Sequence, residues 1–246
     1  MSILIFGMVT FFISALLQGL SGFGFSILAI PLITMVISPR VTVPILLLYS
    51  MIINIAVLHS SRQHMDFSRI WLLLIFGIIG VPLGTKLLLI VNEELLKLFI
   101  GLLILGFGIL LLKGIRKRIK NEKLGMMPVG FLSGILGGSI SISGPPLIIF
   151  LSNQNVDKQT FRASLALYFF LLNIFTLPVY IYNGLITSEV LNYSIKFSPG
   201  LIAGVVLGNL FSHKIKEEHF RKFTLSLLII LGILAITSSL KSILSG

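Results

Sequence analysis

Long apolar segments separated by short polar loops make up almost the whole chain, and this pattern constrains the fold more than any other feature. The hydrocarbon core of a bilayer is about 30 Å thick, so a spanning helix needs about 20 apolar residues. Hydrophobic residues make up 56% of the chain and charged residues 11%, and no soluble fold of this size buries so much apolar surface. We therefore expect an all-α polytopic membrane protein. After a first apolar stretch at residues 3–37, spanning segments are expected at residues 43–58, 70–91, 95–112, 160–182, 191–212 and 221–240.

A basic linker at residues 113–125 divides the chain into two halves, residues 1–112 and 126–246, that resemble each other. Shifting the sequence by 115 residues gives identity at 8 of 17 positions between residues 17–33 and 132–148. A shift of 119 pairs Asn54 with Asn173. A shift of 124 pairs the sequences at residues 80–84 and 204–208. Matched Gly, Pro and Asn in the same order indicate an internal duplication.

Each half opens with a glycine-rich break inside an apolar stretch, at residues 19–24 and 134–144. Glycine lets the backbone turn sharply. The breaks predict a helical hairpin in each half, with arms of 11 to 15 residues that are too short to cross a bilayer comfortably. Each half is then a re-entrant or broken hairpin followed by three transmembrane helices, and whether the hairpins span fully stays open. The predicted arms are residues 4–18 and 25–37 in the first half and residues 126–136 and 142–152 in the second.

Lys and Arg predict how the two halves are oriented. Cytoplasmic loops are enriched in these residues, which explains the net charge of +11 without a nucleic-acid partner. With the linker in the cytoplasm, inverted halves place 14 Lys and Arg inside and 5 outside, whereas parallel halves place 10 inside and 9 outside. The distribution favours two inverted repeats with a cytoplasmic linker.

The two breaks are the candidate substrate site. Paired broken helices in inverted halves point to the binding site of a transporter, and helix N-termini with exposed N–H groups bind anions without a full positive charge. The alternative is close helix packing, in which Gly and Ser are also enriched. The candidate substrate-binding residues are Gly19, Ser21, Gly22, Gly24, Ser26 and Pro31 in the first motif, and Gly137, Gly138, Ser139, Ser141, Pro145 and Pro146 in the second.

Three polar residues outside the breaks complete the candidate set. Asn54 and Asn173 are a matched pair that could contact substrate or form an interhelical hydrogen bond. Arg162 is placed to attract an anion, although a snorkelling or positive-inside Arg is the favoured explanation of its position. No Asp or Glu lies inside a predicted span. Cation pumps usually need such carboxylates, so their absence disfavours a cation substrate.

The sequence carries no sign of enzyme chemistry. It contains no Cys, its four His are scattered, and it has no nucleophile elbow or phosphate-binding loop. We expect neither a catalytic site, a metal nor a cofactor.

The chain resembles the TauE/SafE family of sulfite and organosulfonate exporters along its whole length. The resemblance is carried by two Gly-rich motifs that each end in Pro, at residues 19–31 and 134–146, and by the stretch at residues 158–164. It implies outward transport of an anion across the cytoplasmic membrane, driven by ion gradients.

We therefore expect a multi-pass secondary transporter in the cytoplasmic membrane that exports a small anion such as sulfite or an organosulfonate by alternating access. A passive anion channel and a non-transporting membrane assembly subunit are the alternatives. The expected partners are a small anion and the lipid bilayer, with a coupling ion and homo-oligomer formation left open.

Overall fold

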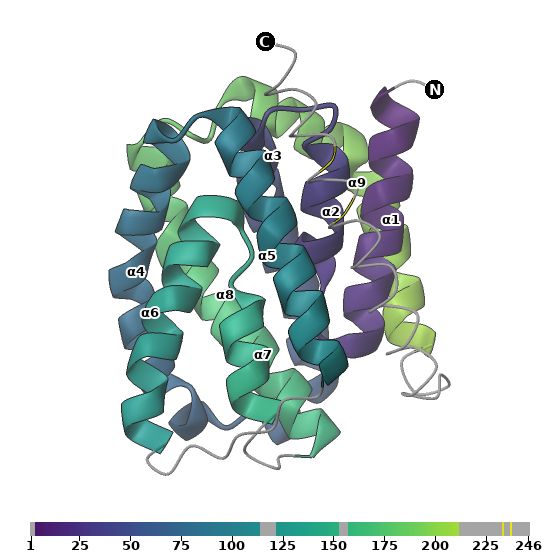
Figure 1. Cartoon of the computed structure of the whole chain (residues 1–246). Helices are drawn as coiled ribbons and strands as arrows, with labels where there is room; N and C mark the ends of the chain where they lie inside the picture. The colour runs from purple at the N-terminus through teal and green to yellow at the C-terminus, as the bar shows by residue number, and fades with distance from the viewer. Residues whose placement is uncertain (1–2, 114–121, 153–156, 212–232, 234–236, 238–246) are drawn as a thin grey trace.

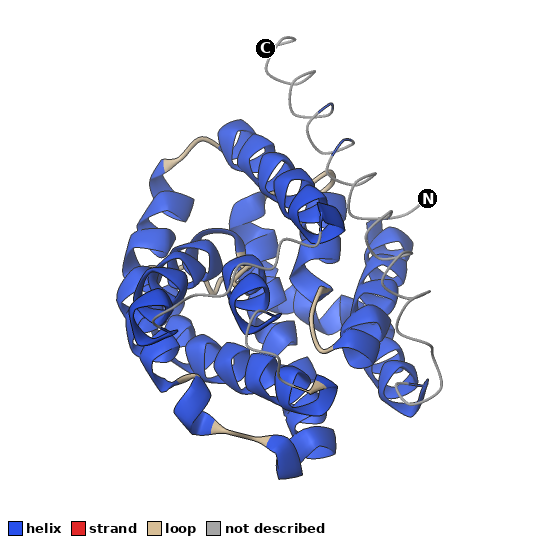
Figure 2. Ribbon diagram, turned by 60° about the horizontal axis from the view of Figure 1, so that its bottom comes forward, coloured by secondary structure: helices blue, strands red, loops and turns tan. Residues whose placement is uncertain are grey.

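The computed structural model describes residues 3–113, 122–152, 157–211, 233 and 237. The part of the chain it describes is helical throughout and contains no strand (Figure 2). Most of the linker and the helix expected at residues 221–240 lie outside the described residues. The described helices are α1 (Ile3–Ser21), α2 (Phe25–Ile33), α3 (Pro39–Ser61), α4 (Trp71–Ile90), α5 (Glu93–Lys113), α6 (Glu122–Ile140), α7 (Gly144–Ser152), α8 (Lys158–Tyr182) and α9 (Ser188–Phe211), with short 3₁₀ turns at Arg62–His64 and Phe67–Arg69 (Figure 1).

Local sequence explains where several helices begin. Ser38 caps α3 by accepting a hydrogen bond from the amide of Arg40, and Pro39 follows at the first helical position. Asp157 caps α8 by accepting from the amides of Gln159 and Thr160 at 3.0 Å. Hydrogen bonds from Thr160 hold the pKa of the Asp157 carboxyl below its usual value.

The two helical breaks are confirmed, but the predicted lengths of the arms are wrong. The first arms, α1 and α6, each have 19 residues, and the second arms, α2 and α7, each have 9. The breaks themselves are shorter than the glycine-rich motifs, because the helices continue through Gly19 and Gly134. Each hairpin therefore combines one helix of nearly full membrane length with a half-length helix.

The first helix of each half packs against the other half. α1 lies along α9, α6 lies along α4, and α3 and α8 pack against each other. In Figure 1, α1 enters from the top and α6 from the bottom, so these two helices run in opposite directions. The halves therefore exchange equivalent helices.

Glycines bring the exchanged helices into backbone contact. A Cβ added to Gly134 of α6 would overlap the carbonyl oxygen of Gly77 in α4, and one added to Gly80 would overlap that of Phe131. On the other side, a Cβ added to Gly204 of α9 would overlap the carbonyl oxygen of Phe12 in α1. Small residues permit such close approach of membrane helices. These contacts explain why α1 and α6 remain helical through their glycines.

The helix bounds give a repeat offset that differs from the sequence alignment of the breaks. At the breaks, the last residues of α1 and α6 are 119 positions apart, and so are the first residues of α2 and α7. The offset of 115 that maximises identity is therefore wrong in this region by about one helical turn, because Gly recurs at helical spacing in both segments. With an offset of 119, the hairpins share the register of α3 and α8.

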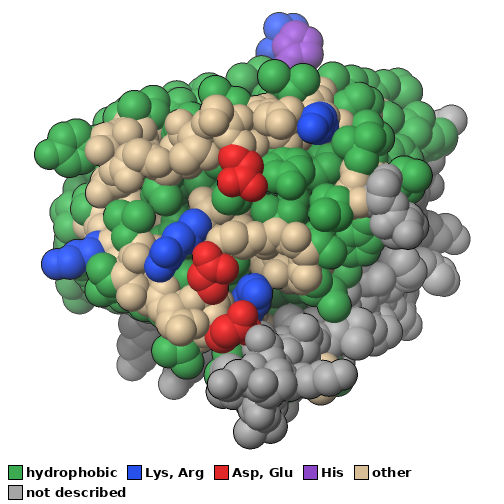
Figure 3. Space-filling view, turned by 90° about the horizontal axis from the view of Figure 1, so that it is seen from above, with side chains coloured by type: hydrophobic (Ala, Val, Ile, Leu, Met, Phe, Trp, Pro, Cys, Tyr) green, Lys and Arg blue, Asp and Glu red, His purple; other side chains and the backbone are tan. Residues whose placement is uncertain are grey.

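Six of the described helices are long and apolar enough to cross a membrane: α1, α3, α4, α6, α8 and α9. The helix predicted at residues 95–112 is present as α5, but it is not among these six and has Glu93, Glu94 and Lys97 in its first turn and a half. Large apolar side chains are exposed along α4 and α9, which suits a face in contact with lipid. In the view from above, acidic and basic side chains share one end of the molecule with many apolar ones (Figure 3).

The α4–α6 contact predicts that two glycine substitutions differ strongly in their effect on the stability of the protein. Gly134→Ala should destabilise the protein by roughly 1–3 kcal/mol, because its methyl group forces two backbones apart. Gly106→Ala is the matched control, since nothing lies within 4 Å of the added Cβ. Thermal unfolding of the purified variants in detergent measures both effects, and equal melting temperatures for the two variants would contradict the assigned contact.

Candidate substrate site

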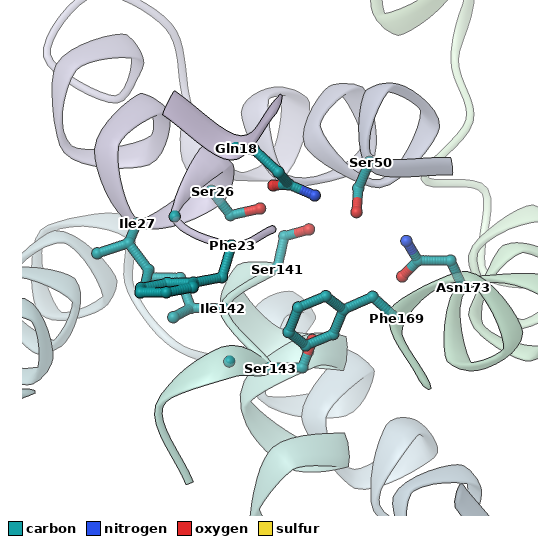
Figure 4. Close-up of a pocket in the computed structure, with 13 residues that line it drawn as sticks. Gln18, Phe23, Ser26, Ile27, Ser50, Ser141, Ile142, Ser143, Phe169 and Asn173 are labelled. Carbon is teal, nitrogen blue, oxygen red and sulfur yellow. The ribbon is translucent and has the colours of Figure 1, made fainter. Parts of the chain in front are cut away.

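A small pocket lies where the two helical breaks meet, between the halves of the molecule (Figure 4). Its cavity volume is about 30 Å³, enough for a group of only a few atoms without rearrangement. The pocket is lined by Gln18, Phe23, Gly24, Ser26, Ile27, Ser50, Gly137, Ser141, Ile142, Ser143, Gly144, Phe169 and Asn173.

The two breaks turn at equivalent positions. Gly22 has φ +84° and Ser141, 119 positions later, has φ +57°. The amide of Gly22 donates to the carbonyl of Gln18 at 2.7 Å, and that of Ser141 donates to the carbonyl of Gly137 at 3.1 Å. Left-handed backbone is unfavourable for a residue with a side chain, so Ser141 is strained at a position where the first half has glycine.

Both halves contribute equivalent positions to the pocket. With the offset of 119, the lining residues include the pairs Gln18 with Gly137, Phe23 with Ile142, Gly24 with Ser143, and Ser50 with Phe169. Four pairs of equivalent positions therefore contribute to the pocket wall. The residue types differ within every pair, so the pocket wall is chemically asymmetric.

A buried chain of amides and hydroxyls forms one wall. Gln18 Nε2 donates to Asn54 Oδ1 at 3.0 Å, and Asn54 Nδ2 donates to Ser50 Oγ at 3.0 Å. Gln18 Oε1 also accepts from the amide of Phe25, the first residue of α2, at 3.2 Å. The chain thus ties α1, α2 and α3 together beside the pocket.

The hairpin tips offer unequal numbers of amides. The first four N–H groups of a helix have no partner within it. In α2 the amide of Phe25 is bound by Gln18, which leaves the amides of Ser26 and Ile27 at this end. In α7 the second and third positions are Pro145 and Pro146, which carry no N–H. The first tip is therefore the richer in backbone donors.

No side chain that lines the pocket carries a charge. The polar ends of Gln18, Ser26, Ser50, Ser141 and Asn173 point toward the same space in Figure 4. Rings of Phe23 and Phe169 border it on the apolar side. Hydroxyls and amides can donate to an oxyanion, while the absence of a carboxylate at the pocket avoids repulsion.

Arg162 does not line the pocket but supports the first break from behind. Its side chain is 3% exposed, and one terminal nitrogen donates to the carbonyl of Gly19 at 2.8 Å and to Asn209 Oδ1 at 2.9 Å. Gly19 lies in the last turn of α1, where carbonyls form the negative end of the helix dipole. Arg162 is therefore a buried cation that stabilises the end of α1, not a snorkelling residue.

The structure divides the predicted site residues into two groups. Gly24, Ser26, Gly137, Ser141 and Asn173 line the pocket. The others lie outside its lining. Gly19 packs against α9, Gly138 packs against α4, and Gly22 packs against Arg162. Ser139 donates to the carbonyl of Ile135, and Asn54 lies within the hydrogen-bonded chain. Pro31, Pro145 and Pro146 lie within α2 and α7, and Ser21 ends α1.

Several lining residues are missing from the sequence-based set. Ser50 and Phe169 lie four residues before the matched asparagines, on the same helical face, so this spacing could have revealed them. Gln18 and Ser143 lie beside the motif glycines, but only tertiary packing turns them toward the pocket. Within the described residues, His, Asp and Glu form no cluster of three or more that could hold a metal ion.

Comparison with known proteins adds one decisive match. The sequence model of the sulfite exporter TauE/SafE family matches residues 7–235 of the chain. These residues include both breaks and the pocket. The chain belongs to this family. No curated protein and no solved structure matches it.

Family membership agrees with the architecture. TauE/SafE proteins are membrane transporters of the sulfite and organosulfonate exporter type, and the six apolar helices make this chain a multi-pass membrane protein. A small anionic substrate and a surrounding lipid bilayer follow at the level of the family.

The strain at Ser141 predicts opposite changes in stability and binding. Ser141→Gly should raise the stability by about 1 kcal/mol, because glycine adopts positive φ without a steric penalty. The same change removes a hydroxyl from the pocket and should weaken anion binding. Melting temperatures with and without added sulfite measure both effects. A fall in stability, or a sulfite-induced shift as large as that of the unmodified protein, would contradict this interpretation.

Proposed function

We propose that this protein is a secondary transporter that exports a small anion, such as sulfite or an organosulfonate, across the cytoplasmic membrane by alternating access. The observation that carries the proposal is the pocket where two broken hairpins meet, lined by neutral hydrogen-bond donors and by no charged side chain. Non-helical backbone at membrane depth is tolerated where it is shielded by protein or lines a cavity, and substrate sites of transporters are built at such breaks.

Neutral donors suit a transporter that must release its cargo. An anion bound by hydroxyls, amides and backbone N–H groups gains hydrogen bonds without forming a buried ion pair. Ser26, Ser141 and Asn173 supply side-chain donors, and the start of α2 supplies amides. Arg162 adds a positive charge behind the first tip without lining the pocket. The small volume favours a compact oxyanion head group.

The exchange of helices between the halves supports an inverted-repeat mechanism. α1 packs on α9 and α6 on α4, while α3 and α8 meet each other. Two interlocked bundles of this kind can rock about a site between them, as alternating access requires. A coupling ion would supply the driving force.

Single-cysteine labelling tests the inverted arrangement, because the chain contains no native Cys. Thr187→Cys, in the exposed turn between α8 and α9, should react with a membrane-impermeant maleimide from outside the cell. Gln63→Cys, between α3 and α4, is the control that should react only from the cytoplasm. Parallel repeats place both positions in the cytoplasm, so cytoplasmic labelling of Thr187→Cys would exclude the inverted arrangement.

Flux into proteoliposomes tests transport and the location of the site. The purified protein should move sulfite or a sulfonate against its gradient when an ion gradient is imposed, whereas a passive channel would move it only downhill. Gly137→Leu should reduce the flux at least tenfold, because the side chain would enter the pocket.

A matched substitution separates the pocket from general damage. Gly106→Leu projects into open space and should retain flux. Gly22 is a poorer test position, since its Cβ would lie 2.5 Å from Arg162 Cγ at a positive φ and any substitution would disturb the fold. Full flux by a correctly inserted Gly137→Leu protein would remove the pocket from the proposal.

A further inference from the structure

The matched asparagines of the two halves have different surroundings. Asn54 in α3 and Asn173 in α8 are 119 positions apart, the offset that also relates the ends of the hairpin helices. Asn54 is fully buried, and Asn173 is 9% exposed and lines the pocket. An inverted duplication would give both residues one role, so the difference requires an explanation from their neighbours.

Both ends of the Asn54 side chain are occupied by protein. Its Oδ1 accepts from Gln18 and its Nδ2 donates to Ser50, each at 3.0 Å. A buried amide that is hydrogen-bonded at both ends is held firmly in position, and Asn54 does not line the pocket. Asn54 is thus a structural link between α1 and α3.

The corresponding partners of Asn173 are missing. The position equivalent to Gln18 is Gly137, and the position equivalent to Ser50 is Phe169, and neither side chain can form a hydrogen bond. In the part of the chain that the structure describes, the Asn173 side chain has no hydrogen-bond partner, and its amide points into the pocket in Figure 4. The residue as a whole is nine-tenths buried, but its amide atoms are not among the fully buried unpaired ones, so they are accessible from the pocket and free to bind a ligand there.

We propose that Asn173 is a specificity-determining residue that donates directly to the transported anion. This rests on the proposed transport function and deepens it. Gly137 and Phe169 stand where the first half has Gln18 and Ser50, which leaves Asn173 free for the substrate, while Gln18 and Ser50 hold Asn54 in place. The Asn173 donor requires an acceptor oxygen on the anion, and Phe169 places an apolar surface beside it.

Asn173→Ala and Asn54→Ala form a matched pair of tests. Asn173→Ala should raise the apparent KM for sulfite at least tenfold in proteoliposomes and change the ratio of the KM values for sulfite and sulfoacetate, with little change in melting temperature. Asn54→Ala should lower the melting temperature, because Gln18 and Ser50 lose their shared partner, and should leave that ratio near the value of the unmodified protein. Asn173→Ser, which keeps a shorter donor, should give an intermediate KM for sulfite.

Binding measured apart from flux separates the two proposals. Sulfite should raise the melting temperature of the unmodified protein in detergent, and Asn173→Ala should abolish that shift. Binding that depends on Asn173 without uphill flux would overturn the transport proposal and support this inference. Uphill flux with unchanged KM values in Asn173→Ala, or the same change of ratio in both alanine variants, would overturn this inference alone. Neither binding nor flux of either anion by the unmodified protein would overturn both.

Discussion

Backbone contact through glycine, between helices that belong to different halves of the chain, is the interaction on which the rest of this structure depends. Lipid offers no hydrophobic driving force between helices, so their association relies on close packing and hydrogen bonds. Gly134 brings α6 against α4, and Gly204 brings α9 against α1. Neither half can form these contacts alone. The interlocked pairs hold the two hairpins facing each other, and the pocket exists only because they do.

The hairpins show how this packing selects between local options. Glycine lowers helix propensity, yet α1 continues through Gly19 because the added flexibility is offset by contact with Gly208. The hairpins break where residues with positive φ turn the chain, at Gly22 and Gly24 in the first and at Ser141 in the second. Arg162 then secures the end of α1 through its carbonyl. The Gly19–Gly208 contact, the turn at Gly22 and the hydrogen bond from Arg162 thus act together on one short segment.

The asymmetry of the pocket follows from sequence differences between equivalent positions of the two halves. Four pairs of equivalent positions contribute to the pocket wall, so each sequence difference between the halves changes one part of the wall and not the other. Gln18 where the second half has Gly137, and Ser50 where it has Phe169, leave a hydrogen-bonded wall on one side and a free amide on the other.

The sequence by itself determined the multi-pass membrane character, the helical class and the two breaks, because each follows from hydropathy or residue types along the chain. Matched residues in the two halves indicated a duplication, which stays a prediction. Five predicted residues, Gly24, Ser26, Gly137, Ser141 and Asn173, line the pocket. Tertiary structure alone decided which motif glycines pack against helices, which repeat offset applies, and why Asn54 and Asn173 differ. Those properties depend on which backbone lies opposite, and residue spacing along one helix carries no information about the helix that faces it.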